Sequence, residues 1–406
     1  MPSHMLTDRT EIANQIPGRI CFLVRGLDGG GAQRDAILLA NELQRRGRPS
    51  AIATLEAKGH LRDLIDPQVP VVDLGRGRKL RLAFAFGAIR RLLTQGRPAA
   101  LISSEAAGNV LAVLASRGLE PQTRPRIILR EVASPVQARH NDPYWQNRLA
   151  YRWVGRLYPQ ADLVITFTAG ACDDLATAFG VPAEKLANLG TNAVLTPAMR
   201  DHITWLARDI EPGLIVSVGR LSPEKGFDTL IEAFSLLRWT RRARLVIVGE
   251  GDERTRLEAL IAARGLSADV TLAGHQSDPL QIVSRAALYV CASLHEGLGN
   301  AVIEALACGV PVVSTDAPHG PREILENGRL GTLVPVGDAP ALAAAMGAAL
   351  DAPADSAALQ TRAAHFTVEA AGARFLDFLD RLDPKLRPLA GDTRSAVTDR
   401  HNLTTA

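Results

Sequence analysis

The chain has 406 residues, of which 47% are hydrophobic and 22% charged, and its formal net charge is only +3. This length predicts two domains, and the small charge gives no indication of a nucleic-acid partner. No apolar run approaches the roughly 18 residues of a transmembrane helix, and the first fifteen residues lack the apolar core of a signal peptide. The four cysteines form no Cys-x-x-Cys pair. We therefore expect a cytoplasmic protein without disulfides or structural zinc.

Short apolar runs alternate with helical patterns from residue 18 onwards. Six runs in the first half have the length of buried strands: 19–24, 50–54, 69–74, 99–103, 126–130 and 162–166. A helical pattern runs from residue 28 to Arg46, and Gly47 closes it as a C-cap. The alternation predicts a Rossmann-like domain over residues 18–196, with a parallel sheet between layers of helices. Residues 1–17 are predicted to be a disordered tail.

The pattern breaks at residues 196–212, which we interpret as a linker because Pro197, Pro212 and the following Gly213 cluster there. A second series follows over residues 212–362. Its predicted strands are 214–218, 244–248, 270–272, 288–291, 310–314 and 331–334, and its clearest helices are 228–237 and 300–307. The fold class is therefore α/β, with two doubly wound domains. A last helix is predicted at 368–382, and the polar residues 385–406 are predicted to be disordered.

The segment 293–309, SLHEGLGNAVIEALACG, carries the strongest chemical signal. A strand ends just before it, a loop carries Glu296, and a helix begins near Asn300 and carries Glu304. Glycines let the backbone approach a ligand, and the free N–H groups of a helix start favour an anion such as a diphosphate. Carboxylates beside that anion would accept hydrogen bonds from sugar and ribose hydroxyls. The plainer alternatives are a solvated loop carboxylate for Glu296 and a helix-dipole partner for Glu304.

A second strand–loop–helix segment, VGRLSPEKGF at 218–227, places Arg220 and Lys225 in one loop. That loop lies at the carboxyl edge of a parallel sheet, where ligands bind in open α/β folds. The two cations would neutralise a nucleoside diphosphate as it leaves. The alternative is a pair of exposed surface cations.

A glycine-rich turn, Gly29 to Arg34, follows the first strand. Arg34 stands where the dinucleotide fingerprint requires Gly or Ala, and no acidic residue ends the second strand, although Glu56 lies nearby. This disfavours a nicotinamide or flavin oxidoreductase. The turn is better interpreted as a backbone-lined wall of a cleft between the domains.

These motifs resemble those of the retaining glycosyltransferases of the group-1 family (family 4), which have the GT-B fold. The resemblance extends over residues 18–382 and includes the E-x7-E pair of Glu296 and Glu304. The segments VGRLSPEKGFDTLIEAF, GEGDER and GVPVVSTDAPHGPREIL are also similar to family segments. The resemblance implies two Rossmann-like domains facing across a cleft, the first completed by the helix at 366–383.

The resemblance also implies a role for each site residue. Arg220 and Lys225 would grip the donor diphosphate, Glu296 would bind hydroxyls of the transferred sugar, and Glu304 would bind the ribose. The backbone of Gly297, Leu298, Gly299 and Asn300 would face sugar and phosphate, with Gly30 and Gly31 across the cleft. The base would lie near Gly249, Glu250 and His275. The chain has no Asp-x-Asp motif, so we expect neither a metal nor a bound cofactor.

One departure concerns the acceptor side. Many family members carry a histidine after the strand that we place at 126–130, whereas this chain has Arg130, Glu131 and, slightly further on, Ser134. Any of the three could take its place at the reaction centre. The donor sugar and the contact at that centre stay open.

The function implied is transfer of a hexose-type sugar from a UDP- or GDP-sugar to a glycan or lipid-linked acceptor, with retention, in envelope or extracellular polysaccharide synthesis. The alternatives are another GT-B enzyme such as an epimerase, and a non-catalytic sugar-nucleotide-binding protein. Two basic segments stand outside the motifs. Residues 75–93 indicate either peripheral contact with an anionic membrane at its inner face or an ordinary helix covering the sheet. Residues 144–158 are predicted to be a core-packing helix with a cationic face rather than a nucleic-acid groove.

Overall fold

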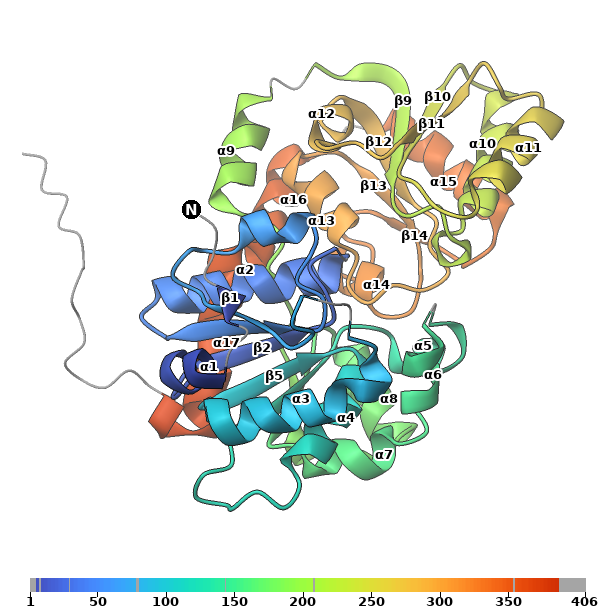
Figure 1. Ribbon diagram of the computed structural model, residues 1–406. Coiled ribbons are helices and arrows are strands. Elements are labelled where there is room, and N and C mark those ends of the chain that lie inside the picture. The colour runs from blue at the N-terminus through green and yellow to red at the C-terminus, as the bar shows by residue number, and fades with distance from the viewer. Residues whose placement is uncertain are drawn as a thin grey trace, which may run out of the picture.

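A computed structural model describes residues 5–6, 9–28, 30–77, 80–142, 144–206, 209–352 and 355–386. Gly29 and most of the predicted C-terminal tail, residues 387–406, lie outside the described residues. The chain forms two α/β domains stacked one above the other, each built around its own sheet (Figure 1). This confirms the fold class predicted from the sequence.

The N-terminal domain contains an eight-stranded sheet in which every pairing is parallel. In spatial order its strands are β1 (Met5–Leu6), β4 (Val71–Asp73), β3 (Ser50–Thr54), β2 (Ile20–Val24), β5 (Ala100–Ser104), β6 (Arg126–Glu131), β7 (Leu163–Thr166) and β8 (Leu186–Asn188). Strand β2 is central and buried throughout, with Ile20 paired to Ser50 on one side and Ala100 on the other. Both faces of this sheet are therefore covered, which explains its continuous apolar runs.

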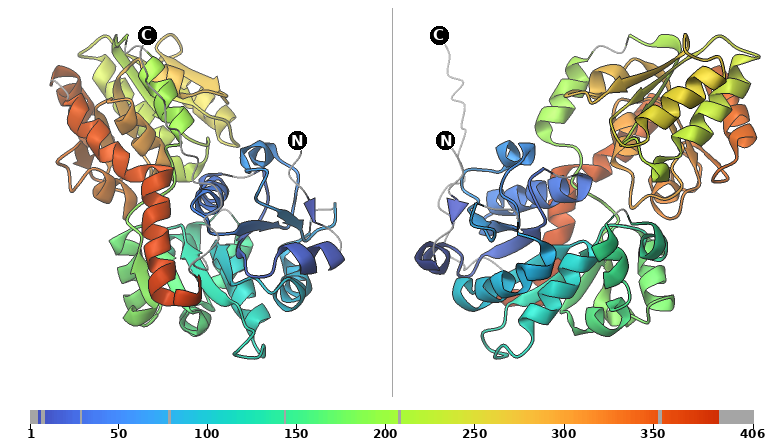
Figure 2. Two further views of the ribbon diagram at one scale, coloured as in Figure 1. Left: turned by 90° about the vertical axis from the view of Figure 1, so that its left-hand side faces the viewer. Right: turned by 45° about the vertical axis from the view of Figure 1, so that its right-hand side comes forward.

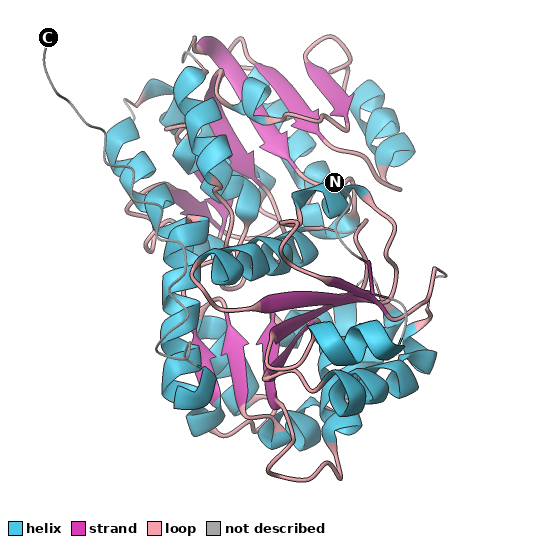
Figure 3. Ribbon diagram, turned by 60° about the vertical axis from the view of Figure 1, so that its left-hand side comes forward, coloured by secondary structure: helices cyan, strands magenta, loops and turns pink. Residues whose placement is uncertain are grey.

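Helices cover both faces of the first sheet (Figure 3). They are α1 (Arg9–Gln15), α2 (Gly31–Arg45), α3 (Ala85–Arg91), α4 (Ala106–Ser116), α5 (Pro135–Asn141), α6 (Trp145–Ala150), α7 (Val154–Leu157) and α8 (Ala169–Thr177). Alternate residues of β2 enter different cores: Ile20 and Phe22 pack in one, Cys21 and Leu23 in the other. Strand β2 is therefore packed against a hydrophobic core on each of its two faces.

The C-terminal domain repeats the design with a six-stranded parallel sheet. In spatial order its strands are β11 (Val270–Gly274), β10 (Arg244–Val248), β9 (Glu211–Val218), β12 (Ala286–Cys291), β13 (Val312–Thr315) and β14 (Thr332–Val334). Its helices are α10 (Phe227–Arg238), α11 (Arg254–Ala263), α12 (Leu280–Val283), α13 (Asn300–Ala307), α14 (Gly320–Ile324), α15 (Ala339–Asp351) and α16 (Ser356–Ala363). The central strands β9 and β12 end at the two loops that the motifs mark.

The last helix, α17 (Val368–Leu382), crosses back to the first domain, as the resemblance implies. Figure 2 shows it as a long red helix running down from the upper domain along the lower one. Its Phe375 ring lies 6.1 Å from that of Phe22 in β2, and both are buried. The amides of Val194 and Leu195 donate to the carbonyl oxygen of Phe366 just before it. The first domain is therefore completed by the end of the chain.

Two predicted irregular segments contain regular structure. In the predicted N-terminal tail, Leu6 pairs with Val72, and Ile12 in α1 and Ile16 directly after it are buried. The prediction of disorder is therefore wrong for residues 5–6 and 9–17, because the spacing of four places both isoleucines on one face. The predicted linker contains α9 (Pro197–Trp205). Thr196 is the N-cap of this helix, and its hydroxyl accepts a hydrogen bond from the Met199 amide.

The basic segment 75–93 is not one amphipathic helix. Its α-helical part, α3, has seven residues, and Ala85, Ile89, Leu92 and Leu93 are buried against the sheet. Arg78 and Lys79 lie outside the described residues. No helix in the described part of the chain combines the length and apolar character that crossing a bilayer requires.

Candidate functional site

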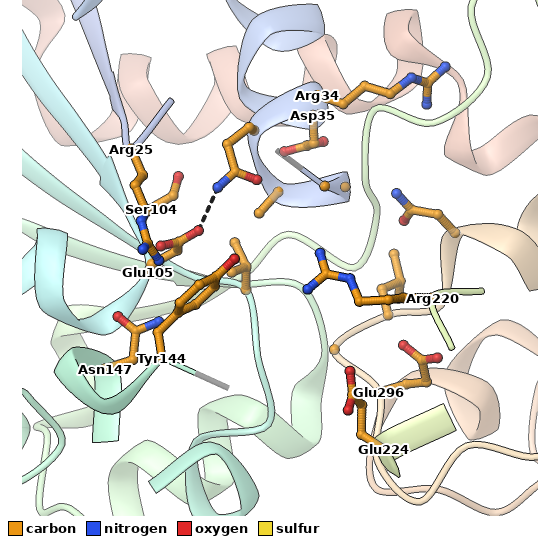
Figure 4. Close-up of a pocket in the computed structure, with 18 of the residues that line it drawn as sticks. Arg25, Arg34, Asp35, Ser104, Glu105, Tyr144, Asn147, Arg220, Glu224 and Glu296 are labelled. Atoms are coloured by element: carbon orange, nitrogen blue, oxygen red, sulfur yellow. Dashed lines mark hydrogen bonds between the residues drawn. The ribbon is translucent and has the colours of Figure 1, made fainter. Parts of the chain in front are cut away.

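A cavity of about 1370 Å³ lies between the two domains. Its walls are the loops at the carboxyl ends of β2 and β5 on one side and of β9 and β12 on the other. Figure 4 shows Arg25, Glu105 and Tyr144 on the N-terminal wall, with Arg220, Glu224 and Glu296 facing them. This is the edge at which open parallel sheets bind their ligands.

The loop after β9 brings two cations to the C-terminal wall. A short 3-10 turn, Pro223–Lys225, ends at Gly226, whose φ of 60° and closeness to the Ala292 carbonyl suit only glycine. Arg220 is exposed and reaches from the loop into the cavity (Figure 4). None of the ion pairs found among the described residues includes Arg220. It is thus a cation available to an anionic ligand.

The second cation, Lys225, is paired with the loop carboxylate. Its Nζ lies 2.5 Å from Oε1 of Glu296, and the Ser293 hydroxyl donates to the same oxygen at 2.8 Å. Burial by itself would lower the pKa of Lys225, but the adjacent Glu296 carboxylate raises it above its ordinary value. Lys225 therefore stays charged, and the second oxygen of Glu296 is left for a ligand.

The loop after β12 leads into α13 through three closely packed residues. Gly299 caps the helix with φ 106°, and a Cβ on Gly297 would lie 2.1 Å from the carbonyl oxygen of Val132 in the other domain. Asn300 begins the helix, and its Nδ2 would lie 2.9 Å from a Cβ on Gly31. Gly31 is itself the first residue of α2. Two helix N-termini, with their free N–H groups, therefore face each other across the cavity.

Glu304 lies deeper along α13 and also lines the cavity. Burial raises the pKa of its carboxyl, and the positive charge of Arg34 across the cleft lowers it by less. No described residue donates a hydrogen bond to this carboxylate. A partly buried carboxylate without a donor is suited to ligand hydroxyls.

The N-terminal wall contains polar side chains that sequence reasoning did not single out. Glu105, at the end of β5, accepts a 2.7 Å hydrogen bond from Nε2 of Gln33 in α2. The guanidinium of Arg25, just after β2, lies 3.7 Å from the centre of the Tyr144 ring. Burial raises the pKa of Glu105, while the charge of Arg25 opposes that shift. The one available signal was position, because Arg25 and Glu105 both follow strands that end at this edge.

The three residues expected on the acceptor side do not line the cavity. Arg130 is fully buried and forms an ion pair with Asp35 of α2, and burial lowers its pKa to about 9. The Glu131 carboxylate accepts from the hydroxyls of Tyr151 and Tyr158, at 2.9 and 2.8 Å. Burial raises the pKa of Glu131 to about 7, and the two tyrosine hydrogen bonds lower it by less.

Ser134 is likewise buried, at the start of α5. The structure therefore places Arg130, Glu131 and Ser134 inside the N-terminal domain and not on the acceptor side of the cavity, where we expected them. The reason is that β6 continues through Glu131. Residues of the N-terminal domain bind both charged side chains at its end: Asp35 binds Arg130, and Tyr151 and Tyr158 bind Glu131.

The residues expected near the base also stand apart from the cavity lining. A Cβ on Gly249 would lie 1.9 Å from the Gly219 carbonyl, so this glycine supports the loop that carries Arg220. Glu250 is exposed and paired with Arg254 at 2.7 Å, and His275 is exposed. Gly30, Gly31 and the segment 296–300, in contrast, line the cavity as expected. Among the described residues, no group of three or more His, Cys, Asp or Glu side chains could hold a metal ion.

Comparison with sequence families gives two matches that together span most of the chain. Residues 205–366 match the family described as glycosyl transferases group 1, and residues 30–190 match the glycosyl transferase 4-like domain. The boundary between the matches falls between the two sheets.

Two curated relatives show what the chain is similar to. One is the N-acetylgalactosamine-N,N'-diacetylbacillosaminyl-diphospho-undecaprenol 4-alpha-N-acetylgalactosaminyltransferase of Campylobacter jejuni, 31% identical over 52% of this chain and 57% of that protein. The other is a GDP-mannose-dependent alpha-mannosyltransferase of Mycobacterium tuberculosis, 31% identical over 47% of this chain and 48% of that protein. The chain thus spans about half the length of these relatives.

Solved structures share the whole fold at low sequence identity. Anabaena Alr3699/HepE, crystallised with UDP and glucose, superposes with a TM-score of 0.68 at 21% identity, covering 90% of this chain and 100% of that one. Sucrose-phosphate synthase from Thermosynechococcus elongatus gives 0.70 at 20% identity, covering 90% and 99%. Both domains and their pairing are therefore common to these proteins and this chain.

Proposed function

The chain belongs to the group 1 glycosyltransferases and has the GT-B fold, and on this premise we propose that it transfers a hexose-type sugar from a UDP- or GDP-sugar to a glycan or lipid-linked acceptor. We place this reaction in envelope or extracellular polysaccharide synthesis, with retention of the anomeric configuration. The observation that carries the proposal is the C-terminal wall of the cavity. There the Lys225–Glu296 pair, the start of α13 and Arg220, which forms no ion pair among the described residues, surround one space.

The donor diphosphate would lie between Arg220, Lys225 and the N-terminus of α13. These groups supply positive charge where negative charge develops as the nucleoside diphosphate departs. Lys225 is held by Glu296 and the α13 amides belong to the helix, so these two groups would act with little reorganisation. We propose for this reason that turnover needs no divalent cation. Activity that persists at full rate in excess EDTA would support this part of the proposal, and activity that only added Mg²⁺ or Mn²⁺ restores would overturn it.

The two carboxylates would bind hydroxyls on either side of that diphosphate. Glu296, already oriented by Lys225 and Ser293, would accept from hydroxyls of the transferred sugar. Glu304 would accept from the ribose hydroxyls, which supply the donors that no described residue offers it. The relative that is GDP-mannose-dependent and the neighbour crystallised with UDP and glucose support a nucleotide-sugar donor.

Transfer would proceed by attack of the acceptor hydroxyl on the face that the diphosphate leaves. The bond from the anomeric carbon to the phosphate oxygen breaks, the bond to the acceptor oxygen forms, and the hydroxyl proton passes to the departing phosphate. Contact between the domains, such as Gly297 against Val132, would exclude water and limit donor hydrolysis.

A thermal-shift screen of UDP-, GDP- and ADP-sugars tests the proposal, with Glu304→Ala as the informative variant. One sugar nucleotide should raise the melting temperature of the wild type. Glu304→Ala should weaken its affinity about tenfold or more, the loss expected for a hydrogen bond to a charged group. Glu258→Ala is the matched control, because that carboxylate lies on the outer surface, paired with Arg254.

Unchanged affinity in Glu304→Ala would remove the ribose assignment. Release of free nucleoside diphosphate should also depend on an acceptor, which separates transfer from epimerisation. Stabilisation by no sugar nucleotide would contradict the proposal as a whole.

A further inference from the structure

The segment from α6 to α7 exposes large apolar side chains to solvent. Trp145, Leu149 and Trp153 are 59%, 44% and 48% exposed, although they recur every four residues as a helix's core face would. The opposite face is the buried one, with Ala150 and Val154 in the core. The sequence-based prediction of a core-packing helix with a cationic face holds for the buried side but did not include the exposed aromatic side chains of the outer face. Apolar side chains clustered in this way mark a binding surface rather than ordinary scatter.

Arginines surround this stripe. Arg139, Arg148 and Arg152 line a shallow concavity of about 430 Å³ together with His140, Trp145 and Leu149. No ion pair in the described part of the chain includes any of the three arginines. The exposed arginines of the C-terminal domain differ, since Arg254 and Arg264 each have a glutamate partner. No carboxylate lines the concavity itself, although the charge of Arg148 acts on the nearby carboxylate of Asp142.

We use the name α5–α6 patch for Arg139, Trp145, Arg148, Leu149, Arg152 and Trp153. Figure 1 shows α5 and α6 at one side of the lower domain. Trp145 and its neighbour Tyr144 also line the main cavity, and so does Phe84, which is 72% exposed. The patch is therefore continuous with the mouth of the candidate site.

We propose that the α5–α6 patch binds the surface of an anionic phospholipid bilayer. Indole and leucine side chains partition into the headgroup region, and arginines pair with lipid phosphates while their stems cover apolar surface. The alternation of exposed tryptophans with arginines that form no described ion pair fits this interface better than a purely polar or purely apolar partner. Docked in this way, the cavity mouth would lie at the bilayer, where a lipid-attached acceptor could reach it.

The segment 75–93 differs, because Ala85, Ile89, Leu92 and Leu93 are buried while Phe84 and Phe86 are exposed; membrane contact there stays a separate prediction. Membrane binding is a property of the outer surface and does not require sugar transfer. The proposal deepens the proposed function by naming the partner surface, and the two can fail separately.

Co-sedimentation with lipid vesicles tests the patch. At low salt the wild type should sediment with vesicles of phosphatidylcholine and phosphatidylglycerol at 3:1, and far less with phosphatidylcholine alone or at high salt. The double variant Leu149→Asp/Trp153→Asp should reduce the partition coefficient at least tenfold. Neither residue lines the main cavity, so stabilisation by sugar nucleotide should be unchanged. Wild-type binding to vesicles by the double variant would overturn the proposal.

The chain offers a matched control, because its other two tryptophans lie away from the patch. Trp205 and Trp239 are 77% and 86% exposed, at the ends of α9 and α10. Trp205→Asp/Trp239→Asp should sediment like the wild type. An equal loss in this control would show general surface hydrophobicity and would contradict a specific patch.

Tryptophan fluorescence gives an independent readout. In Trp205→Phe/Trp239→Phe, the remaining tryptophans are Trp145 and Trp153, and their emission should shift to the blue and be quenched by brominated lipid. In Trp145→Phe/Trp153→Phe, neither change should occur. Quenching in the second variant but not in the first would place the membrane contact elsewhere and overturn the proposal.

Two further outcomes separate this proposal from the proposed function. Arg220→Ala should lose donor binding and still sediment with anionic vesicles. If the wild type instead binds a single-stranded oligonucleotide through Arg148 and Arg152 and ignores vesicles, the patch is a polyanion site and the bilayer assignment fails.

Discussion

The two walls of the cavity are built in different ways. On the C-terminal wall, the polar side chains come from two strand–loop–helix segments, and Lys225 and Ser293 both donate to Glu296. On the N-terminal wall, Arg25, Gln33, Glu105 and Tyr144 come from four separate elements and meet only through tertiary contacts. The first wall is thus a pair of local motifs, whereas the second depends on how the whole domain packs. Variants on the two walls should accordingly affect different properties.

The largest effect is expected for Arg220→Ala on the C-terminal wall. Removing one donor to a developing charge typically costs about 10²–10³-fold in turnover, and no described residue forms an ion pair with Arg220. Turnover of the sugar nucleotide should fall by that factor, measured as kcat/KM with the donor found in the screen. Arg220→Lys should retain part of the activity because it keeps a cation without the planar fork.

The control for Arg220 is Arg264→Ala, which removes a surface arginine paired with Glu232 in the same domain. Its kinetics should match the wild type. Full activity in Arg220→Ala would mean that the diphosphate is bound elsewhere. It would contradict the assignment of donor binding to the C-terminal wall.

The next effect concerns stability on the N-terminal side, where Glu131 is enclosed. Its pKa is raised to about 7, chiefly by burial, so the folded protein keeps this proton where the unfolded chain has lost it. The associated stabilisation is fully present below the unfolded pKa and is lost as the pH rises through about 7, amounting to roughly 3 kcal/mol at most. The free energy of unfolding, measured in urea at pH 5 and pH 8, should fall with pH.

Glu131→Gln removes the titrating group while keeping an acceptor for Tyr151 and Tyr158. The variant should therefore lose most of the pH dependence between pH 5 and 8 and be the more stable protein at pH 8. Glu120→Gln, at an exposed position, serves as the control. If the free energies of unfolding of the wild type and Glu131→Gln differ by the same amount at pH 5 and pH 8, the raised pKa of Glu131 is contradicted.

The sequence predicted regular elements best where a local pattern determines them. Helices α13 and α17 and strands β3 and β10 match their predicted bounds. It missed α1 and β1 because both are short and depend on burial, as for Ile12 and Ile16. It missed α9 because two prolines and a glycine dominated the pattern, although Pro197 stands at the first turn, where proline is tolerated.

The same distinction holds for the candidate site. Lys225 and Glu296 were predicted together from two motifs, and the structure places them 2.5 Å apart. The residues after β6 could not be placed, because strand alternation alone does not say which neighbour captures a side chain. Asp35, ninety-five positions earlier, takes Arg130 into the domain interior. Arg25 and Glu105 could not be selected from sequence, since an isolated charged residue after a strand is common.

A smaller effect is expected where the two walls touch. A Cβ on Gly297 would lie 2.1 Å from the Val132 carbonyl, so Gly297→Ala is incompatible with the present contact and should shift the domains apart. Inserting a methyl group into such a contact costs about 1–3 kcal/mol. Turnover should fall about tenfold, and small-angle scattering should report a larger radius of gyration.

Gly347→Ala in α15 is the control for Gly297, because its Cβ would meet Leu237 at an ordinary 3.6 Å. This variant should keep full activity and gain a little stability, as alanine does in a helix. An unchanged radius and unchanged activity in Gly297→Ala would show that the walls do not need this contact.

The smallest effect, at Glu105, separates strain from chemistry on the N-terminal wall. Glu105 has φ 70° and ψ 141°, a conformation that non-glycine residues rarely adopt and that costs about 1–3 kcal/mol. Glu105→Ala and Glu105→Gly both lose the carboxylate and its hydrogen bond from Gln33, but only glycine relieves the strain. Glu105→Gly should therefore be the more stable of the two by about 1 kcal/mol in urea unfolding. Both should bind the sugar nucleotide like the wild type, unlike Arg220→Ala, while transfer to an acceptor falls. Equal stability of the two variants would remove the argument from strain, and weakened donor binding in both would assign Glu105 to the same ligand as the opposite wall.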